Sequence, residues 1–169
     1  MGKIKSTKKK NTKRPWNYSW AVADANISDP ILQFLAGLLK STIERRATDT
    51  STSEKPLKSS ICESGFAVGL RSVLRHLEQG KLVVALFNHE DWPGYLCYHV
   101  GIVSKNSCTH CAQVKNLSAV IAPVLGCHSV RAFGIKNSSS DEVQLLVDQI
   151  KFQLPQISVT ESDFLTYFQ

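Results

Sequence analysis

The stretch Leu82-Val83-Val84-Ala85-Leu86-Phe87 is the longest uninterrupted apolar run of the chain. A strand with one face in water alternates apolar and polar residues, whereas a strand covered by helices on both faces is apolar throughout. The run therefore predicts an interior strand with a layer of helices on each side. It is far shorter than the ~20 apolar residues that span a bilayer, so it predicts no membrane helix.

Helical and extended patterns alternate on both sides of this strand. Upstream, Phe66–Val68 is either a short strand or the beginning of a helix that Gly80 ends. The apolar face of that helix consists of Leu70, Val73, Leu74 and Leu77. Downstream we expect a helix that begins at Asp91 and Pro93 and carries Leu96, Val100 and Val103, followed by a strand over Cys108–Val114. A short helix with Leu117, Val120 and Ile121 comes next, and then a strand over Ser129–Ile135. The last helix is capped by Ser139 or Ser140. The inward face of the last helix consists of Val143, Leu146, Val147, Ile150 and Leu154.

The N-terminal part of the chain predicts one further helix and a loop. Ser28-Asp29-Pro30 offers a capping side chain followed by a proline preset for the first turn, and Arg45 and Arg46 suit the negative end of the helix. The expected inward stripe is Ile31, Phe34, Leu35, Leu38, Leu39 and Ile43. Residues 47–60 are rich in Ser and Thr and have almost nothing to bury, which predicts a mobile loop.

Strands that alternate with helices of about ten residues predict one layered α/β domain with helices on both faces of the sheet. A length of 169 residues allows about one domain, and a content of 43% apolar and 20% charged residues is ordinary for a globular protein. We divide the chain into a basic arm over 1–14, an aromatic segment and helix over 15–46, the loop over 47–60, a core over 61–154 and a C-terminal segment over 155–169. The last segment is either a docking strip or a cover for the sheet.

The positive charge of the chain is concentrated in the basic arm. Of 20 basic and 14 acidic residues, seven basic ones lie within residues 1–14, which leaves a net charge of −1 for residues 15–169. The seven are Lys3, Lys5, Lys8, Lys9, Lys10, Lys13 and Arg14. Such a block stays disordered until a polyanion or a receptor neutralises it, which is typical of a nuclear-targeting or nucleic-acid-binding tail; a solubilising extension is the alternative. No apolar segment follows the arm, so we expect no secretory signal and a soluble intracellular protein.

Three large aromatic side chains follow the arm in Pro15-Trp16-Asn17-Tyr18-Ser19-Trp20. Beside cations they can stack on nucleic-acid bases. They can equally attach the chain to the surface of the domain, since aromatic side chains bury a large area at low entropic cost. We favour attachment.

The positions of cysteine, histidine and acidic residues favour neither a metal site nor catalysis. Five cysteines without a secretory signal favour free thiols, and Cys108-Thr109-His110-Cys111 has no second pair of ligands. A strand would also point Cys108 and Cys111 to opposite faces. His89-Glu90-Asp91 lies at the end of the interior strand, where α/β proteins can hold catalytic groups, but acids before a helix also suit its dipole. We therefore expect no metal, no cofactor and no catalytic residue, and keep a hydrolase at His89–Asp91 as the enzyme alternative.

The best candidate site is the helix start Gly69-Leu70-Arg71-Ser72-Val73-Leu74-Arg75. With the apolar face inward, Arg71 and Arg75 lie one turn apart on the solvent face. Free N–H groups of the first turn, the Ser72 hydroxyl and two guanidinium groups form a surface suited to phosphate. The alternative is an ordinary solvated helix face on which Glu78 balances one of the arginines.

These residues and two further stretches resemble a known family. Gly69–Lys81, the strand Leu82–Phe87, Asp91 with Pro93, and Lys115 are similar to the kink-turn RNA-binding ribosomal protein superfamily. Within it, Leu117-Ser118-Ala119-Val120-Ile121-Ala122-Pro123-Val124-Leu125-Gly126 and Pro15–Trp20 resemble the thirty-eight-kilodalton-type protein subunits of ribonuclease P and ribonuclease MRP. The resemblance covers residues 15–46 and 61–160 and implies a single three-layer α/β/α sandwich with a central mixed sheet.

The resemblance also implies which residues bind RNA. The superfamily uses a Gly-x-Asn-Glu-x-x-Lys/Arg motif at a helix start, where Gly69 matches the glycine and Arg75 the basic residue. Arg71 and Ser72 replace the Asn–Glu pair, which suits contacts to phosphates and sugars rather than to base edges. Lys115 matches a basic residue before a second RNA-facing loop, and Leu96 matches an apolar contact. The loop itself is matched by Ala122, Pro123, Val124, Leu125 and Gly126, and the basic arm adds Lys8, Lys9, Lys10, Lys13 and Arg14.

On this resemblance we expect a non-catalytic RNA-binding subunit of ribonuclease P and ribonuclease MRP that supports removal of the 5′ leader of precursor tRNA and processing of ribosomal RNA. The expected partners are ribonuclease P RNA, MRP RNA and other protein subunits, with no membrane and no small-molecule substrate. The expected location is the nucleus and its nucleolus. The alternatives are a protein-interaction scaffold of the same particle that has lost kink-turn readout, and a subunit of another RNA–protein particle, ribosomal or small nucleolar.

Overall fold

The apolar run forms an interior strand, as its composition predicts. It lies in β2 (Leu82–Asn88), whose two neighbours in the sheet are β4 (Ala132–Lys136) and β3 (His110–Val114). The structure is a computed structural model and describes residues 20–49, 65–90, 94–137 and 140–157, without the side chains of 46–49 and 94–98. Its remaining elements are α1 (Ala25–Asp49), β1 (Phe66–Val68), α3 (Leu70–Glu78), α4 (Gly94–Ser107), α5 (Leu117–Val124) and α6 (Asp141–Gln153).

The sheet is mixed, with the strand order β1-β4-β2-β3. Strand β4 is antiparallel to both of its neighbours, and β2 and β3 are parallel. Strands β1, β2 and β3 therefore all run in one direction and end at the same edge of the sheet, where β4 begins.

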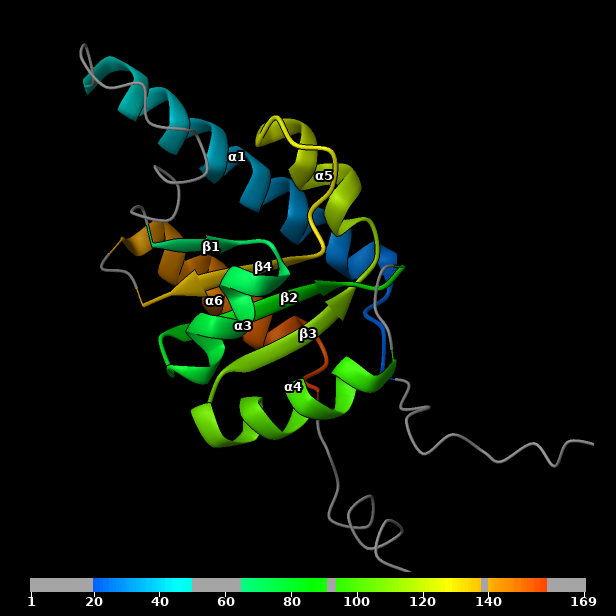
Figure 1. The fold of residues 1–169 in the computed structure, drawn as a ribbon. Helices are drawn as coiled ribbons and strands as arrows, with labels where there is room; N and C mark the ends of the chain where they lie inside the picture. Colours follow the sequence, from blue (N-terminus) through cyan, green and yellow to red (C-terminus); the bar gives the residue numbers. More distant parts are fainter. Residues whose placement is uncertain (1–19, 50–64, 91–93, 138–139, 158–169) are drawn as a thin grey trace, which may run out of the picture.

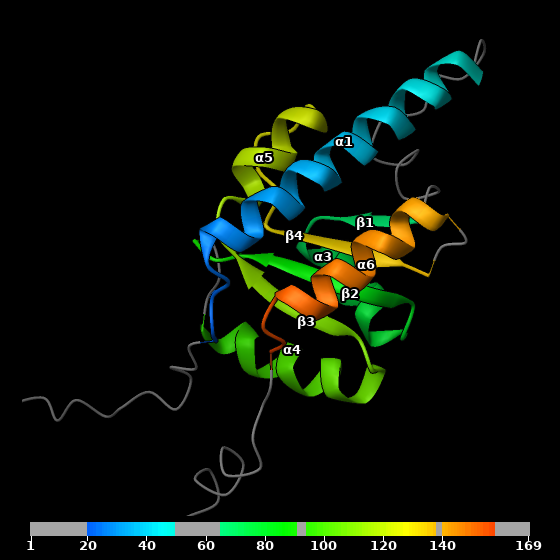
Figure 2. The same ribbon diagram turned by 180° about the vertical axis from the view of Figure 1, so that it is seen from behind.

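Helices cover both faces of the sheet (Figures 1 and 2). On one face, α1, α5 and α6 pack against side chains such as Val84, Leu86 and Phe133. On the other face, α3 and α4 pack against Ala85, Phe87 and Cys111. Alternate residues of β2 thus lie in the two cores, which explains why the strand has no polar face. The expected three-layer α/β/α sandwich with a central mixed sheet is confirmed.

Helix α3 has the predicted faces and the predicted end. Its apolar face is buried or half-buried, whereas Arg71 and Arg75 are exposed. At its end, the N–H of Gly80 donates to the carbonyl of Leu77, and the N–H of Lys81 donates to that of His76. This pair of bonds is the Schellman arrangement that stops a helix.

Helix α1 differs from the expectation at both ends. It begins at Ala25 rather than after Ser28, because the carboxylate of Asp24 accepts the N–H of Asn26 at 3.4 Å in the manner of a cap. Pro30 consequently lies inside the helix and has no N–H to donate to the carbonyl four residues earlier. The helix tolerates it because this position is exposed and water can bind that carbonyl. The helix continues to Asp49, so residues 47–49 are helical and not part of the predicted loop.

The inward stripe of α1 is also broader than predicted. Phe34 is 39% exposed, whereas Leu32, which we did not include, is fully buried. The helix packs against both α5 and α6, so side chains on a wide arc of its surface are covered.

The strands β3 and β4 begin later than predicted. Cys108 has a positive φ of 52° and belongs to the turn before β3. Ser129 to Arg131 lie before β4, where the N–H of Val130 donates to the Ser118 hydroxyl at 3.0 Å. The N-cap residue of the last helix is Ser140, one of the two serines predicted for this position.

The outer edge of β3 is covered by the two ends of the described chain. The N–H of Ala23 donates to the carbonyl of Gln113 at 3.0 Å, and the N–H of Ile157 donates to that of Cys111 at 2.8 Å. Trp20 is buried against Phe87, with ring centroids 6.3 Å apart. These contacts confirm attachment to the domain for Trp20, and show that residue 157 covers the sheet edge.

Several predictions fall outside the described residues: the arm over 1–14, Trp16 and Tyr18, residues 50–60 of the loop, Asp91 with Pro93, Ser139, and residues 158–169. Of the helices in the described part, none has the length and apolar character needed to cross a bilayer.

Candidate nucleic-acid interface

The candidate residues lie along the sheet edge at which the parallel strands end. Gly69 follows β1, His89 follows β2 and Lys115 follows β3, while Arg131 precedes β4. Backbone hydrogen bonds of 2.9 Å join these chain segments: Gly69 N–H to Ala132 carbonyl, Asn88 N–H to Arg131 carbonyl, and His89 N–H to Val114 carbonyl. We call this the strand-end edge. In open α/β sheets this is the edge at which ligands usually bind.

Gly69 sets the direction in which α3 begins. It occupies the N-cap position with φ 86° and ψ 151°, a conformation that is essentially restricted to glycine. Among the described residues, no side chain caps the N–H groups of the first turn. The positive end of the helix is therefore directed at the surface with donors available to a ligand.

Arg71 and Ser72 lie in the first turn of α3 and Arg75 lies one turn after Arg71; with Gly69 they form what we call the arginine ledge. The ledge lines a surface depression of about 410 Å³ together with Val68, Leu70 and His76. The imidazole Nδ1 of His76 donates to the Ser72 carbonyl at 2.8 Å, which holds His76 against the helix.

The two guanidinium groups of the ledge are exposed and, within the described residues, form no ion pair. In the alternative interpretation, Glu78 balances the charge of one of these arginines. In the structure, Oε1 of Glu78 lies 3.3 Å from Nε2 of His99 in α4 instead. Within the described residues, both guanidinium groups are therefore available to an anion that approaches the ledge.

Arg131 is a candidate that the sequence analysis missed. It is exposed, and the next residue, Ala132, accepts the hydrogen bond of Gly69. Its side chain therefore begins about one strand spacing, ~4.8 Å, from the start of the ledge. The available signal was a basic residue at the predicted strand Ser129–Ile135, but only the pairing of β4 with β1 shows that it adjoins Gly69.

Lys115 lies on the same edge but further along it. It is exposed and follows β3, which is three strand spacings, about 14 Å, from β1. The structure thus places Lys115 on the same side of the molecule as the ledge without contact between them. His89 and Glu90 are exposed between the two, and Asp91 lies outside the described residues.

The predicted RNA-facing loop over 122–126 is largely helix. Ala122, Pro123 and Val124 belong to α5, and the chain reverses only at Gly126, whose φ is 60°. The N–H of Gly126 donates to the carbonyl of Pro123, and the N–H of Cys127 donates to that of Ala122, which is again the Schellman arrangement. Proline and glycine thus mark the end of a helix here rather than a loop.

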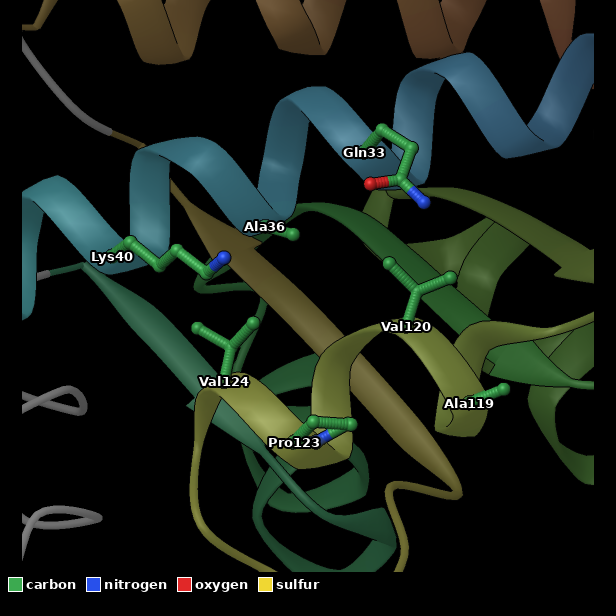
Figure 3. Close-up of a pocket in the computed structure, with 7 residues that line it drawn as sticks. All are labelled: Gln33, Ala36, Lys40, Ala119, Val120, Pro123 and Val124. Carbon is green, nitrogen blue, oxygen red and sulfur yellow. The ribbon is translucent and has the colours of Figure 1, made fainter.

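The same residues differ in their access to a ligand. Ala122 and Leu125 are buried in the core, Val124 is half-buried, and Pro123 and Gly126 are exposed. Figure 3 shows Val120 and Val124 of α5 pointing toward Ala36 of α1 across a groove of about 380 Å³. The contact of this segment with RNA stays a prediction. The side chain of Leu96 lies outside the described residues.

The described cysteines and histidines form no cluster that could hold a metal. Cys111 is buried in β3, whereas Cys108 is exposed in the turn before that strand, so the predicted alternation within one strand does not apply to this pair. Burial raises the pKa of Cys111 to about 12, although a hydrogen bond with Ser104 acts in the other direction. Burial lowers the pKa of His110, which a backbone hydrogen bond with Leu154 partly offsets.

Known proteins with a similar amino-acid sequence are protein subunits of ribonuclease P. No protein-family model matches the chain. Ribonuclease P protein subunit p38 from Homo sapiens is 29% identical over 92 residues, which are 54% of this chain and 31% of the human protein. Its counterpart from Bos taurus is 26% identical over 178 aligned positions, which cover 82% of this chain and 63% of the bovine protein. The matches thus span less than two thirds of either relative, and they support a relationship between this chain and the p38 protein subunits of ribonuclease P.

Proposed function

We propose that this chain is a non-catalytic RNA-binding subunit of a ribonuclease P-type particle, and that the arginine ledge binds the RNA backbone. The observation that carries the proposal is the pair of exposed guanidinium groups that line the depression beside the start of α3, with no acidic partner among the described residues. Arg131 extends the same positive surface along the strand-end edge.

The chemistry of the ledge suits phosphate and sugar rather than base edges. Guanidinium groups form paired hydrogen bonds with phosphate oxygens, and the N–H groups of a helix start add a fixed positive potential. Such contacts position a protein on RNA but carry little sequence information. The proposed ligand is therefore a folded RNA recognised by the shape of its backbone, such as a bent helix.

The relatives extend this proposal to a particle. Both are named as protein subunits of ribonuclease P, and we propose ribonuclease P RNA, MRP RNA and neighbouring protein subunits as the partners of this chain. Its role would be to support removal of the 5′ leader of precursor tRNA and processing of ribosomal RNA, in the nucleus and nucleolus. The basic arm would add phosphate contacts beside those of the ledge.

Charge reversal of the ledge tests the proposal. We expect the full chain with Arg71→Glu and Arg75→Glu to lose at least tenfold in affinity for a kink-turn RNA, and the slope of log K against log salt to fall by about 1.8 if each arginine neutralises one phosphate of a duplex. Both side chains are exposed, so the thermal unfolding midpoint should stay unchanged.

A matched control is available at the opposite edge of the sheet. Lys81 precedes β2 and Lys105 lies in the last turn of α4 before β3, and both are exposed. The double variant Lys81→Glu, Lys105→Glu changes the net charge by the same amount and should retain most of the affinity. Equal losses in both double variants would show that only net charge matters, and an unchanged affinity of the ledge variant would remove the ledge from the proposal.

Arg71 and Ser72 stand in place of the Asn–Glu pair, which favours a second candidate function. In this alternative the chain is a protein scaffold that does not recognise a kink-turn. Comparison of the kink-turn RNA with a scrambled RNA of the same length separates the two. Preference for the kink-turn supports direct recognition, and equal weak binding supports the scaffold. Sequencing of the RNA that co-purifies with the full chain from nuclear extract distinguishes ribonuclease P from a ribosomal or small nucleolar particle.

A further inference from the structure

Helix α6 carries two large apolar side chains that the described part of the chain leaves exposed. Leu145 is 54% exposed and Phe152 is 91% exposed, although the opposite side of the same helix is fully buried at Leu146 and Ile150. Among the described residues no other large hydrophobic side chain is as exposed as these two. An exposed phenylalanine of this kind is typical of an interaction surface rather than of a folded core.

The exposed apolar residues form one stripe with two acids. Asp141, Leu145, Asp148 and Phe152 are all exposed and follow one another at intervals of four, three and four residues. This is the spacing of a helix face that packs along another helix. Leu145 and Phe152 lie two turns, about 10.5 Å, apart along the helix axis. We call these four residues the α6 stripe.

We propose that the α6 stripe binds an amphipathic helix of another protein that has lysine or arginine residues beside its apolar face. Leu145 and Phe152 supply the apolar contacts, and Asp141 and Asp148 pair with the cations of the partner. Figure 2 shows α6 beside α1 in the layer of helices that covers one face of the sheet. This inference does not rest on the proposed RNA binding.

The charge of the stripe argues against two other occupants. Phosphate would be repelled by the two aspartates, so RNA is not the ligand of this face. A second copy of the chain would place aspartates against apolar side chains or against each other, with no cation of the stripe to pair with them. The stripe also lies on the face opposite α3, so a protein bound there would leave the arginine ledge free.

Two designed peptides of equal length serve as probes: a helix with leucine on one face and lysine beside it, and the same helix with glutamate in place of lysine. We expect the full chain to bind the leucine–lysine peptide at least tenfold more tightly, as measured by fluorescence anisotropy. The Leu145→Asn, Phe152→Asn variant should lose at least tenfold in that affinity, and Asp141→Asn, Asp148→Asn should abolish the preference for lysine.

The matched control is the apolar pair Ile27 and Phe34 of α1, which has the same seven-residue spacing and is 42% and 39% exposed. The Ile27→Asn, Phe34→Asn variant should bind the leucine–lysine peptide within twofold of the original chain. Three outcomes would each overturn the proposal. The first is equal affinity for both peptides, and the second is an equal loss of affinity in the α1 and α6 variants. The third is a dimer, seen in sedimentation, that the Leu145→Asn, Phe152→Asn variant no longer forms. Kink-turn RNA affinity of the α6 variant should stay unchanged, which keeps this test separate from that of the ledge.

Discussion

Replacement of Arg131 by alanine tests whether the strand-end edge, and not α3 alone, binds RNA. The residue lies immediately before Ala132, whose carbonyl is 2.9 Å from the N–H of Gly69. We therefore expect the exposed Arg131 side chain to contact one phosphate of an RNA that binds at the ledge. One lost phosphate contact lowers the salt slope by about 0.9 on a duplex, which corresponds to about a fivefold loss of affinity near 0.15 M salt.

The assay is fluorescence anisotropy of a labelled kink-turn RNA, titrated with the full chain between about 0.05 and 0.2 M salt. We expect Arg131→Ala to shift the slope by about one contact, and Arg131→Lys to keep it, because one positive charge suffices for one phosphate. Lys105→Ala, at the opposite edge, should leave the slope unchanged. Since Arg131 is exposed, folding should be affected by less than about 0.5 kcal/mol. A folded Arg131→Ala variant with the original slope would refute the assignment of this residue to the interface.

Three further predictions concern the core and its titrating groups. Phe133 is fully buried with its ring 5.6 Å from that of Phe66, so Phe133→Ala should lower the free energy of unfolding by about 3–5 kcal/mol in urea titrations, and a loss below about 1 kcal/mol would contradict this packing. Because the pKa of Cys111 is raised to about 12, iodoacetamide at mildly alkaline pH should modify exposed Cys108 and spare Cys111 until the protein unfolds, as peptide mass spectrometry can follow. The pKa of His110 is lowered below its ordinary 6.5, so the unfolded state takes up the proton first, and stability should fall as the pH drops from 6.5 toward the folded pKa. His110→Gln should flatten this part of the stability profile, and an identical profile in both proteins would contradict it.

Much of the fold is readable from local patterns. The apolar run of β2, the inward face of α3 and the glycine after it each depend on neighbours a few residues away, and each is found where predicted. The exposure of Arg71 and Arg75 follows from the same reasoning, since a side chain opposite the apolar face of a helix must face water.

The predictions from sequence fail where one pattern of residues is compatible with two local structures. Asp24 and Ser28 are both capable caps, and in the structure Asp24 accepts the N–H of Asn26, so the helix begins at Ala25. Pro123 and Gly126 are typical of loops, yet the burial of Ala122 and Leu125 in the core stabilises a helix up to this point. Phe34 matched the helical stripe, but its exposure depends on which helices lie beside α1.

The amino-acid sequence by itself determined that this is a layered α/β protein, and that Arg71 and Arg75 lie on the side of α3 opposite its apolar face. Only the tertiary structure decided that Arg131 adjoins Gly69, that Lys115 lies three strand spacings from β1, and that Phe152 is 91% exposed. The physical reason is that periodicity reports which face of an element is buried, whereas the order of strands and the neighbours of each helix depend on contacts between segments far apart in the chain.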